Sequence, residues 1–333
     1  MPSLSVETRS ILRAHGLHPK KALGQNFLID REALQSVVRA AEVRAGDVVL
    51  EIGPGVGTLT TELADQGAEV VAVELDERLA AVLAERTAQG RHVRVVRGNA
   101  LHLDLAPLLP TGEPFKLVAN IPYYITAPIL RHFLEGPWRP ALIVLMVQKE
   151  VAGRLAAQPG DMSLLGVMAQ FYARVEIVRV VPASSFLPAP QVDSAIVRLR
   201  RHEMPPVTVD NVDRFFKVVK AGFGEKRKQL HNALVRGLAH IPAPQIDAAL
   251  EQAGIDRTRR AETLRLEEWG RLYQAIGAQP AAQRKQPSPS RTQRAPLPDR
   301  RRGELGVCNT PLPPSPLEGE GAGGVRGKDE QCS

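Results

Sequence analysis

The sequence has few cysteines, few aromatic residues and no long apolar run, and each scarcity narrows the class of protein. Its two cysteines, Cys308 and Cys332, stand in a polar C-terminal stretch, so the body has no thiol for a disulfide framework, a metal cluster or a nucleophile. We therefore expect no metal centre and a reducing, cytoplasmic location. No stretch reaches the roughly 20 apolar residues that cross a bilayer. Residues 1–13 carry Glu7 and Arg9 where an export signal would be apolar. These features predict a soluble protein that is not exported and does not bind membranes.

Basic residues outnumber acidic ones. The chain has 43 Lys and Arg against 36 Asp and Glu, a formal net charge of +7 and a pI of about 9.6. This excess favours a polyanionic partner such as nucleic acid, although a basic tail alone could account for much of it. Hydrophobic residues make up 44% of the chain, which is enough to fill a core.

Short apolar runs alternate with segments of helical period from about Asp30 to Gln148, the pattern of a parallel sheet covered by helices. We expect strands at Val48–Ile52, Glu69–Val73, Val93–Arg97, Phe115–Ala119 and Ala141–Val147, with helices that include Thr58–Gln66 and Asp76–Thr87. Two later strands, Val175–Val181 and Ser194–Arg200, should form an antiparallel pair that finishes the sheet. The predicted fold class is therefore α/β, with a mainly parallel sheet and an antiparallel last strand.

Composition divides the chain into regions. Residues 1–17 form an N-terminal extension, and residues 18–201 form the α/β domain. A linker at 202–207 contains Met204-Pro205-Pro206, and residues 208–277 have the period of a small helical domain. Residues 278–333 are rich in Pro, Gly, Ser, Gln and Arg and should be disordered, because they lack the apolar side chains that a core needs.

The first strand leads into a glycine-rich turn, Glu51–Gly57, with the spacing G-x-G-x-G. Gly53 and Gly55 stand where the backbone must approach a ligand closely. Thr58 occupies the position of the third glycine in the dinucleotide fingerprint, which argues against a nicotinamide cofactor. The alternative is a tight connection with no ligand, since Gly-Pro-Gly turns often follow strands.

Polar residues also end the next two strands. Glu74 can accept both hydroxyl hydrogens of a ribose, and the amide oxygen of Asn99 can accept a hydrogen bond from an adenine amine. Taken alone, Glu74 could be a solvated strand end and Asn99 a turn residue. Because ligands of open α/β sheets bind at the carboxyl ends of the strands, the three features together predict a site for an adenosine-containing cofactor.

After the fourth strand comes Asn120-Ile121-Pro122-Tyr123, the most informative segment of the chain. An adenine amine is a poor nucleophile because its lone pair is delocalised into the ring. The Asn120 amide oxygen and the Ile121 carbonyl can accept its hydrogens and aim the lone pair at a methyl donor. Pro122 fixes the turn, and Tyr123 can stack on a base pulled from its helix. The alternative is a proline turn with a packed tyrosine. Because the segment follows a strand of the same sheet as the glycine loop, we favour an adenine methyltransferase that uses S-adenosylmethionine.

A second loop, Ser185–Ser194, carries Phe186 among prolines that stiffen the backbone. Phe186 could form the opposite wall of a base pocket. The alternative is simple packing of Phe186 in the core.

Together these residues resemble the KsgA-type small-subunit ribosomal RNA adenine dimethyltransferases. The resemblance extends from about His18 to Ile276 and depends on Gly24–Leu28, Glu51–Gly57, Asn120–Tyr123, Gln148–Val151, Phe186–Ser194 and Phe223–Leu234. It implies a Rossmann-like methyltransferase domain and a small helical domain that helps to dock on RNA. It also implies a monomer that acts in ribosome biogenesis, on 16S ribosomal RNA within a small subunit or its precursor. Two adjacent adenosines near the 3′ end of that RNA would each receive two methyl groups from S-adenosylmethionine.

The resemblance also implies roles for individual residues. The methionine end of the cofactor would contact Asn26 and Leu28, the Gly53 backbone would approach the cofactor, and Asn120 would touch both the cofactor and the target amine. Glu74 would bind the ribose and Asn99 the adenine. The family usually has aspartate where Asn99 stands, so this site loses a charge and we expect weaker cofactor affinity.

Two basic patches are candidates for RNA phosphate contacts: Lys20 and Lys21 before the site, and Lys226, Arg227 and Lys228 on an expected helix. Taken alone, each patch could simply be a solvated face.

Three rival functions stay open. Erythromycin-resistance methyltransferases share the Asn-Ile-Pro-Tyr core but modify large-subunit RNA, and Val192-Asp193-Ser194 with Lys226–Leu234 fits the small-subunit family better. A ribosome-assembly binding factor would use the same fold without methylation, which the intact Asn120–Tyr123 segment disfavours. A nicotinamide dehydrogenase is disfavoured by Thr58.

Overall fold

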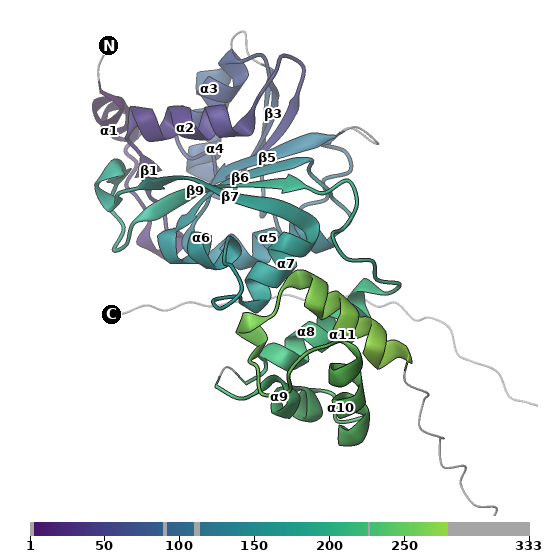
Figure 1. The fold of residues 1–333 in the computed structure, drawn as a ribbon. Coiled ribbons are helices and arrows are strands. Elements are labelled where there is room, and N and C mark those ends of the chain that lie inside the picture. Colours follow the sequence, from purple (N-terminus) through teal and green to yellow (C-terminus); the bar gives the residue numbers. More distant parts are fainter. Residues whose placement is uncertain (1–2, 89–91, 110–113, 226, 279–333) are drawn as a thin grey trace, which may run out of the picture. The chain divides into compact units, whose positions relative to one another are not determined.

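The computed structural model describes residues 3–88, 92–109, 114–225 and 227–278. Lys226 and the expected tail from residue 279 onward lie outside the described residues. Figure 1 shows a sheet with helices on both sides, followed in the chain by the helices α8 to α11.

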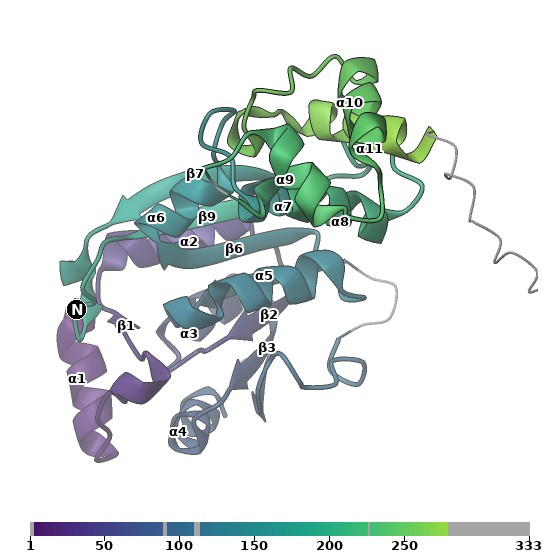
Figure 2. The ribbon, with the colours of Figure 1, turned by 90° about the horizontal axis from the view of Figure 1, so that it is seen from below.

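The centre of the fold is a seven-stranded mixed sheet with the order β4-β3-β2-β5-β6-β9-β7. Its strands are β2 (Val48–Ile52), β3 (Glu69–Glu74), β4 (Val93–Arg97), β5 (Phe115–Asn120), β6 (Leu142–Gln148), β7 (Ala173–Val181) and β9 (Ser194–Arg201). Strands β2 to β6 are parallel, whereas β9 runs antiparallel to both β6 and β7. This order confirms the predicted α/β class and its antiparallel finish. Figure 2 shows the strand direction turning across the sheet, as sheet twist requires.

Alternate residues of each strand pack against helices on opposite faces of the sheet. Leu50 and Ile52 belong to a core cluster with α5 (Thr126–Glu135), whereas Val49 belongs to a second cluster. The helices are α2 (Arg31–Ala41), α3 (Thr58–Asp65) and α4 (Glu77–Thr87) beside the second cluster, and α5, α6 (Lys149–Leu155) and α7 (Leu164–Tyr172) beside the first. Figure 1 shows α2 and α3 on one side of the sheet and α5, α6 and α7 on the other. The predicted helices Thr58–Gln66 and Asp76–Thr87 are confirmed as α3 and α4, and the Asp76 side chain caps α4 by accepting a hydrogen bond from the Arg78 N–H.

The predicted N-terminal extension contains a helix, α1 (Leu4–Ala14), that is packed on the α/β body. Leu12 shares a small core cluster with Leu79 and Val82 of α4. Arg86 of α4 also pairs with Glu7 at 3.3 Å. The extension therefore packs against α4, the helix that follows β3.

The predicted helical segment consists of α8 (Val212–Phe223), α9 (Leu230–Gly237), α10 (Ala243–Gln252) and α11 (Leu266–Ala278). Trp269 of α11 is fully buried against Gly222 of α8, where a side chain would collide with the indole ring. Phe215 of α8 stacks on Phe171 of α7 with ring centroids 5.1 Å apart. One core cluster therefore runs from the sheet through α7 into these helices.

The prediction of a helix at Lys226–Lys228 is wrong for Arg227 and Lys228, and Lys226 lies outside the described residues. Helix α8 ends at Phe223 and α9 begins at Leu230, so Arg227 and Lys228 lie in the turn between them. The Lys228 N–H donates to the Glu225 carbonyl, which closes that turn locally instead of continuing the helix.

Within the described ranges, no helix has both the length and the apolar character required to span a bilayer. The same ranges contain no group of three or more His, Cys, Asp and Glu side chains arranged to hold a metal ion.

Two short strands, β1 (Phe27–Leu28) and β8 (Phe186–Leu187), form a separate antiparallel pair. Leu28 is opposite Phe186, and the Ile29 N–H donates to the Ser185 carbonyl at 2.8 Å. This pairing joins the segment before α2 to the loop before β9, so both segments border the same end of the sheet.

Candidate active site

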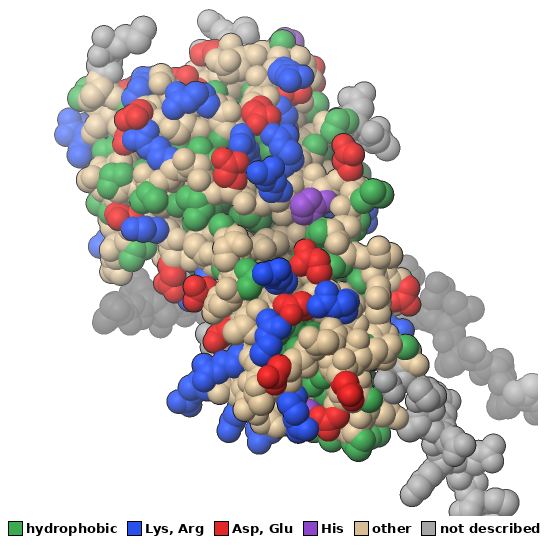
Figure 3. All heavy atoms as spheres, in the orientation of Figure 1, with side chains coloured by type: hydrophobic (Ala, Val, Ile, Leu, Met, Phe, Trp, Pro, Cys, Tyr) green, Lys and Arg blue, Asp and Glu red, His purple; other side chains and the backbone are tan. Residues whose placement is uncertain are grey.

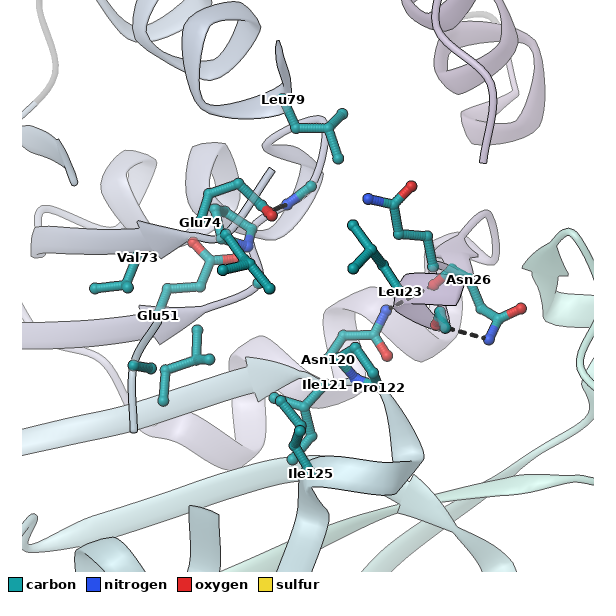
Figure 4. A pocket seen from close by; sticks show the side chains of 18 of the residues that line it. Leu23, Asn26, Glu51, Val73, Glu74, Leu79, Asn120, Ile121, Pro122 and Ile125 are labelled. Carbon is teal, nitrogen blue, oxygen red and sulfur yellow. Dashed lines mark hydrogen bonds between the residues drawn. The ribbon is translucent and has the colours of Figure 1, made fainter. Parts of the chain in front are cut away.

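A cavity lies at the carboxyl ends of β2, β3, β4 and β5, where the sequence predicted a shared site. Every candidate cofactor residue lines it: Asn26, Leu28, Gly53, Gly55, Glu74, Asn99 and Asn120. Ile121, Pro122 and Tyr123 line it as well. Figure 4 shows Glu51, Glu74 and Asn120 arriving from three strands at this cavity, and Asn26 on the loop before α2, with its Nδ2 donating to the Gly24 carbonyl.

The glycine loop has the backbone geometry that its sequence requires. Gly53 has a φ of +68° and Gly55 a φ of +59°, values that side chains with a Cβ rarely adopt. A Cβ on Gly55 would also lie 3.0 Å from the Phe27 ring. The backbone of this turn also holds Glu74, because the Gly55 N–H donates to Glu74 Oε2 at 3.0 Å.

Glu74 is held rigidly at the end of β3. Its Oε1 accepts from the Asp76 N–H at 2.9 Å while its Oε2 accepts from Gly55, and the residue is 6% exposed. Burial raises the pKa of Glu74, and the two backbone N–H donors oppose that rise. Each carboxylate oxygen can accept a second hydrogen bond, so the fixed carboxylate can bind a pair of hydroxyl groups.

Asn99 lines the same cavity but is exposed and already has a local partner. Its Oδ1 accepts from the Leu101 N–H at 3.0 Å, the arrangement of an Asx turn. The turn alternative named from the sequence is therefore present. It leaves the oxygen one further lone pair for an adenine amine.

Glu51 is a candidate that the sequence reasoning missed. It lines the cavity, is 1% exposed, and its Oε2 has no hydrogen-bond partner within the described residues. Burial, together with the neighbouring charge of Glu74, raises the pKa of Glu51 to about 8. An acidic residue inside an otherwise apolar strand was the available signal. A buried carboxyl facing a cavity fits a cationic ligand group.

Asp76 ties the loop before α2 to the end of β3. Its carboxylate pairs with the Lys20 ammonium at 2.7 Å and accepts from Gln25 Nε2 at 3.3 Å. Although burial disfavours its charge, hydrogen bonds from Lys20, Gln25 and the Arg78 N–H lower the pKa of Asp76. The Lys20 ammonium was expected to contact RNA, but in this structure it forms an ion pair with the Asp76 carboxylate. Lys21 is exposed at the start of the neighbouring 3₁₀ turn.

Asn120 is oriented by the same loop. Its Nδ2 donates to the Asn26 backbone carbonyl at 3.2 Å, so the amide oxygen is the end left available toward the cavity. Within the described residues no hydrogen bond reaches the Ile121 carbonyl. Two acceptors therefore stand next to each other at the end of β5, as the amine-orienting hypothesis requires.

Tyr123 is half-buried at the edge of the cavity. Its hydroxyl is hydrogen-bonded to the Ser194 hydroxyl at 2.7 Å, and Ser194 is fully buried at the start of β9. Burial raises the pKa of Tyr123, so the phenol stays protonated near neutral pH. The bond fixes the ring's edge and leaves its face for contact with a base.

Phe186 does not line the cavity. The residue is 3% exposed and packs in the second core cluster, opposite Leu28 in the β1–β8 pair. In this structure the core-packing alternative holds, because strand pairing turns the ring inward. The Ser185–Ser194 loop reaches the cavity through Ser194 and its bond to Tyr123 instead.

The remaining candidate RNA contacts, Arg227 and Lys228, are exposed in the turn between α8 and α9. Figure 3 shows Lys and Arg side chains interleaved with Asp and Glu over the visible face. On such a mixed surface, phosphates would be contacted by local groups of cations. The RNA contacts of Arg227 and Lys228 stay predictions.

The family model for ribosomal RNA adenine dimethylase matches residues 16–277. The ribosomal RNA small subunit methyltransferase A of Dehalococcoides mccartyi is 43% identical over 271 residues, covering 81% of this chain and 93% of the relative. The enzyme of the same name from Moorella thermoacetica is 44% identical over 279 residues and is covered to 96% of its length.

Two solved structures have the same fold. The 23S rRNA methyltransferase ErmE has a TM-score of 0.62 and 34% identity, covering 76% of this chain and 100% of its own. A dimethyladenosine transferase from Plasmodium falciparum has a TM-score of 0.65 and 28% identity, covering 75% and 98%. The matched span holds the glycine loop, Glu74 and the Asn120–Tyr123 segment. The chain therefore belongs to the ribosomal RNA adenine dimethylase family and is an S-adenosylmethionine-dependent methyltransferase.

Proposed function

We propose that this enzyme transfers methyl groups to the N6 amines of two adjacent adenosines near the 3′ end of 16S ribosomal RNA, two to each base. The observation that carries the proposal is the hydrogen bond from Asn120 Nδ2 to the Asn26 carbonyl. It joins the segment that would hold the methyl donor to the side chain that would hold the methyl acceptor.

The residues of the cavity fit S-adenosylmethionine. Glu74 offers fixed acceptors for the ribose hydroxyls, and Asn99 borders the end where the adenine would lie. Glu51 offers a buried carboxyl for a positively charged group. When bound, the cofactor supplies an electrophilic methyl group on a positively charged sulfur.

Asn120 and Ile121 would orient the target amine. Their two carbonyl oxygens accept its hydrogens, so the nitrogen becomes more pyramidal and its lone pair points toward the cofactor side. No side chain has to remove a proton before transfer, because the methylated nitrogen is acidic and loses its proton afterwards. The contribution of Asn120 is therefore to alignment of the reacting nitrogen.

Tyr123 would hold the base. A base removed from its helix loses stacking on both sides, and one aromatic face returns about 1–3 kcal/mol of it. The hydrogen bond to Ser194 fixes the ring in advance, which lowers the entropy lost on binding.

The choice of the small subunit is supported by relatives at 43% and 44% identity with that printed name, against 34% for the large-subunit enzyme. We propose that the protein acts as a monomer in the cytoplasm, on the small subunit or its precursor, with Lys21, Arg227 and Lys228 among its phosphate contacts. A role in ribosome biogenesis follows from that substrate.

Primer extension across the 3′ end of small-subunit RNA tests the proposal, because dimethylated adenines block reverse transcription. Subunits that lack the modification should acquire two adjacent stops after incubation with wild-type protein and S-adenosylmethionine. Asn120→Ala should give none within the same time while the folded variant still binds subunits. Stops that appear only in large-subunit RNA would overturn the assignment of substrate. Wild-type single-turnover rates in Asn120→Ala, at saturating cofactor, would overturn the proposed mechanism.

A further inference from the structure

Two adjacent tyrosines at the cavity have opposite environments. Tyr123 and Tyr124 both lie in a 3₁₀ turn (Tyr123–Ile125), where successive side chains point in directions about 120° apart. Tyr123 is half-buried and bonded to Ser194, whereas Tyr124 is 61% exposed and has no hydrogen-bond partner within the described residues. Both line the cavity that contains Asn120.

The ring of Tyr124 lies near the backbone of Gly24. A Cβ built on Gly24 would lie 3.4 Å from Cε1 of Tyr124 and 3.1 Å from Cβ of Pro122. The backbone at Gly24, with a φ of +62°, therefore lies directly against the ring. A Cβ at that position would be in van der Waals contact with the ring and tight against Pro122. The Gly24 backbone holds Tyr124 in place while much of its surface stays exposed.

A single exposed aromatic residue needs no explanation by itself. Tyr124 differs because it borders a cavity, follows the Asn120–Tyr123 segment directly and packs on the loop that carries Asn26. Moving one adenosine into the cavity also unstacks the nucleotide beside it. An aromatic face at the mouth can replace that lost stacking for any base.

We propose that Tyr124 stacks on the nucleotide adjacent to the target adenosine and is a positioning residue for RNA. This inference depends on the proposed function, since it needs an RNA base in the cavity beside Tyr123. Tyr123 then holds the reacting base, and Tyr124 holds its neighbour in the position from which the strand turns into the site.

The test compares Tyr124→Ala with Tyr124→Phe, which keeps the aromatic face and loses only the hydroxyl. Small subunits lacking the modification serve as substrate, and the measured quantities are kcat, KM for subunits, subunit affinity by sedimentation and S-adenosylmethionine affinity by calorimetry. Met204→Ala is the matched control, since Met204 is 82% exposed and does not line the cavity. Thermal melting checks that each variant is folded.

We expect Tyr124→Ala to raise KM and weaken subunit affinity by about fivefold or more, as loss of one stacked base requires. Tyr124→Phe and Met204→Ala should stay within about twofold of wild type, and cofactor affinity should not change. An unchanged KM in Tyr124→Ala would overturn the inference. So would an equal defect in Tyr124→Phe, which would assign the effect to the hydroxyl, or weakened cofactor binding, which would make Tyr124 part of the cofactor wall. If the wild-type protein methylated no subunit, the proposed function would be overturned instead. The subunit affinities of Tyr124→Ala and Tyr124→Phe would still show whether Tyr124 stacks on RNA.

Discussion

Replacing Glu51 with glutamine should make the cofactor-free protein more stable at neutral pH, with an advantage that grows as pH rises. Glu51 is 1% exposed and its Oε2 has no partner within the described residues, so ionisation inside the fold is unfavourable. Because its folded pKa is raised from 4.5 to about 8, its contribution to stability is complete below its unfolded pKa. That contribution is lost as pH rises toward the folded pKa.

The size of the effect follows from the shift. Between the unfolded pKa and pH 7, the folded state holds a proton that the unfolded state has released. The free energy of unfolding therefore falls by about 1.36 kcal/mol for each pH unit in that range. The accumulated loss at pH 7 is about 3 kcal/mol. For a domain of this size that corresponds to roughly 5 °C in Tm. Glutamine at this position does not titrate, so any offset from its amide is the same at every pH.

Thermal melting of wild type and Glu51→Gln without cofactor, from about pH 5 to about pH 8, measures this difference directly. The gap in Tm should widen by several degrees across that range. A cationic ligand group would also favour the ionised carboxyl, so cofactor binding near pH 7 should release up to about one proton in wild type and none in Glu51→Gln. Calorimetry in two buffers of different ionisation enthalpy counts those protons. A gap in Tm that stays constant with pH would refute the reasoning about Glu51.

Other parts of the site give further expectations. Glu74→Ala should weaken S-adenosylmethionine binding by roughly tenfold or more, because two ribose hydroxyls lose a fixed acceptor, and an unchanged dissociation constant in calorimetry would remove Glu74 from the site. Asp76→Asn should lower the Tm slightly above pH 5 and have less effect in acid. The lowered pKa of Asp76 means that its stabilisation is lost as pH falls through that folded value, so a Tm difference independent of pH would contradict the pairing with Lys20. Replacing Arg227 and Lys228 together with alanine should weaken subunit binding and reduce its salt slope by up to about 2, whereas an identical slope in a salt titration would place both side chains in solvent only.

The seven strands of the main sheet could be predicted from the sequence almost residue by residue, whereas the short pair β1 and β8 was not predicted. Val48–Ile52 and Val93–Arg97 have the predicted bounds, and the other predicted strands differ by one or two residues. Short apolar runs between glycines and polar turns leave little freedom in where a buried strand begins and ends. The convergence of Glu74, Asn99 and Asn120 also followed, because parallel strands place their carboxyl ends at one edge.

The residue roles that could not be predicted from the sequence depend on tertiary contacts. Phe186 was a candidate base contact because its neighbours are prolines, but its orientation is decided by pairing with Leu28, which is far away in sequence. Lys20 appeared to be a free cation until the fold brought Asp76 to it. Glu51 was read as the start of a glycine loop, whereas its importance comes from burial with Oε2 left without a partner among the described residues. The partners of Phe186 and Lys20 are distant in the chain, and the burial of Glu51 depends on the assembled fold, so no local pattern carries the information.

The contacts around Asp76 also explain why the two halves of the site act as a unit. Asp76 holds Glu74 through its backbone N–H and holds the loop before α2 through Lys20 and Gln25. That loop carries the Asn26 carbonyl, which sets the direction of the Asn120 amide. A chain of hydrogen bonds thus runs from the ribose acceptor to the acceptor for the target amine. The contacts that hold Glu74 therefore also position the Asn120 oxygen, so the ribose acceptor and the acceptor for the target amine are fixed by one network.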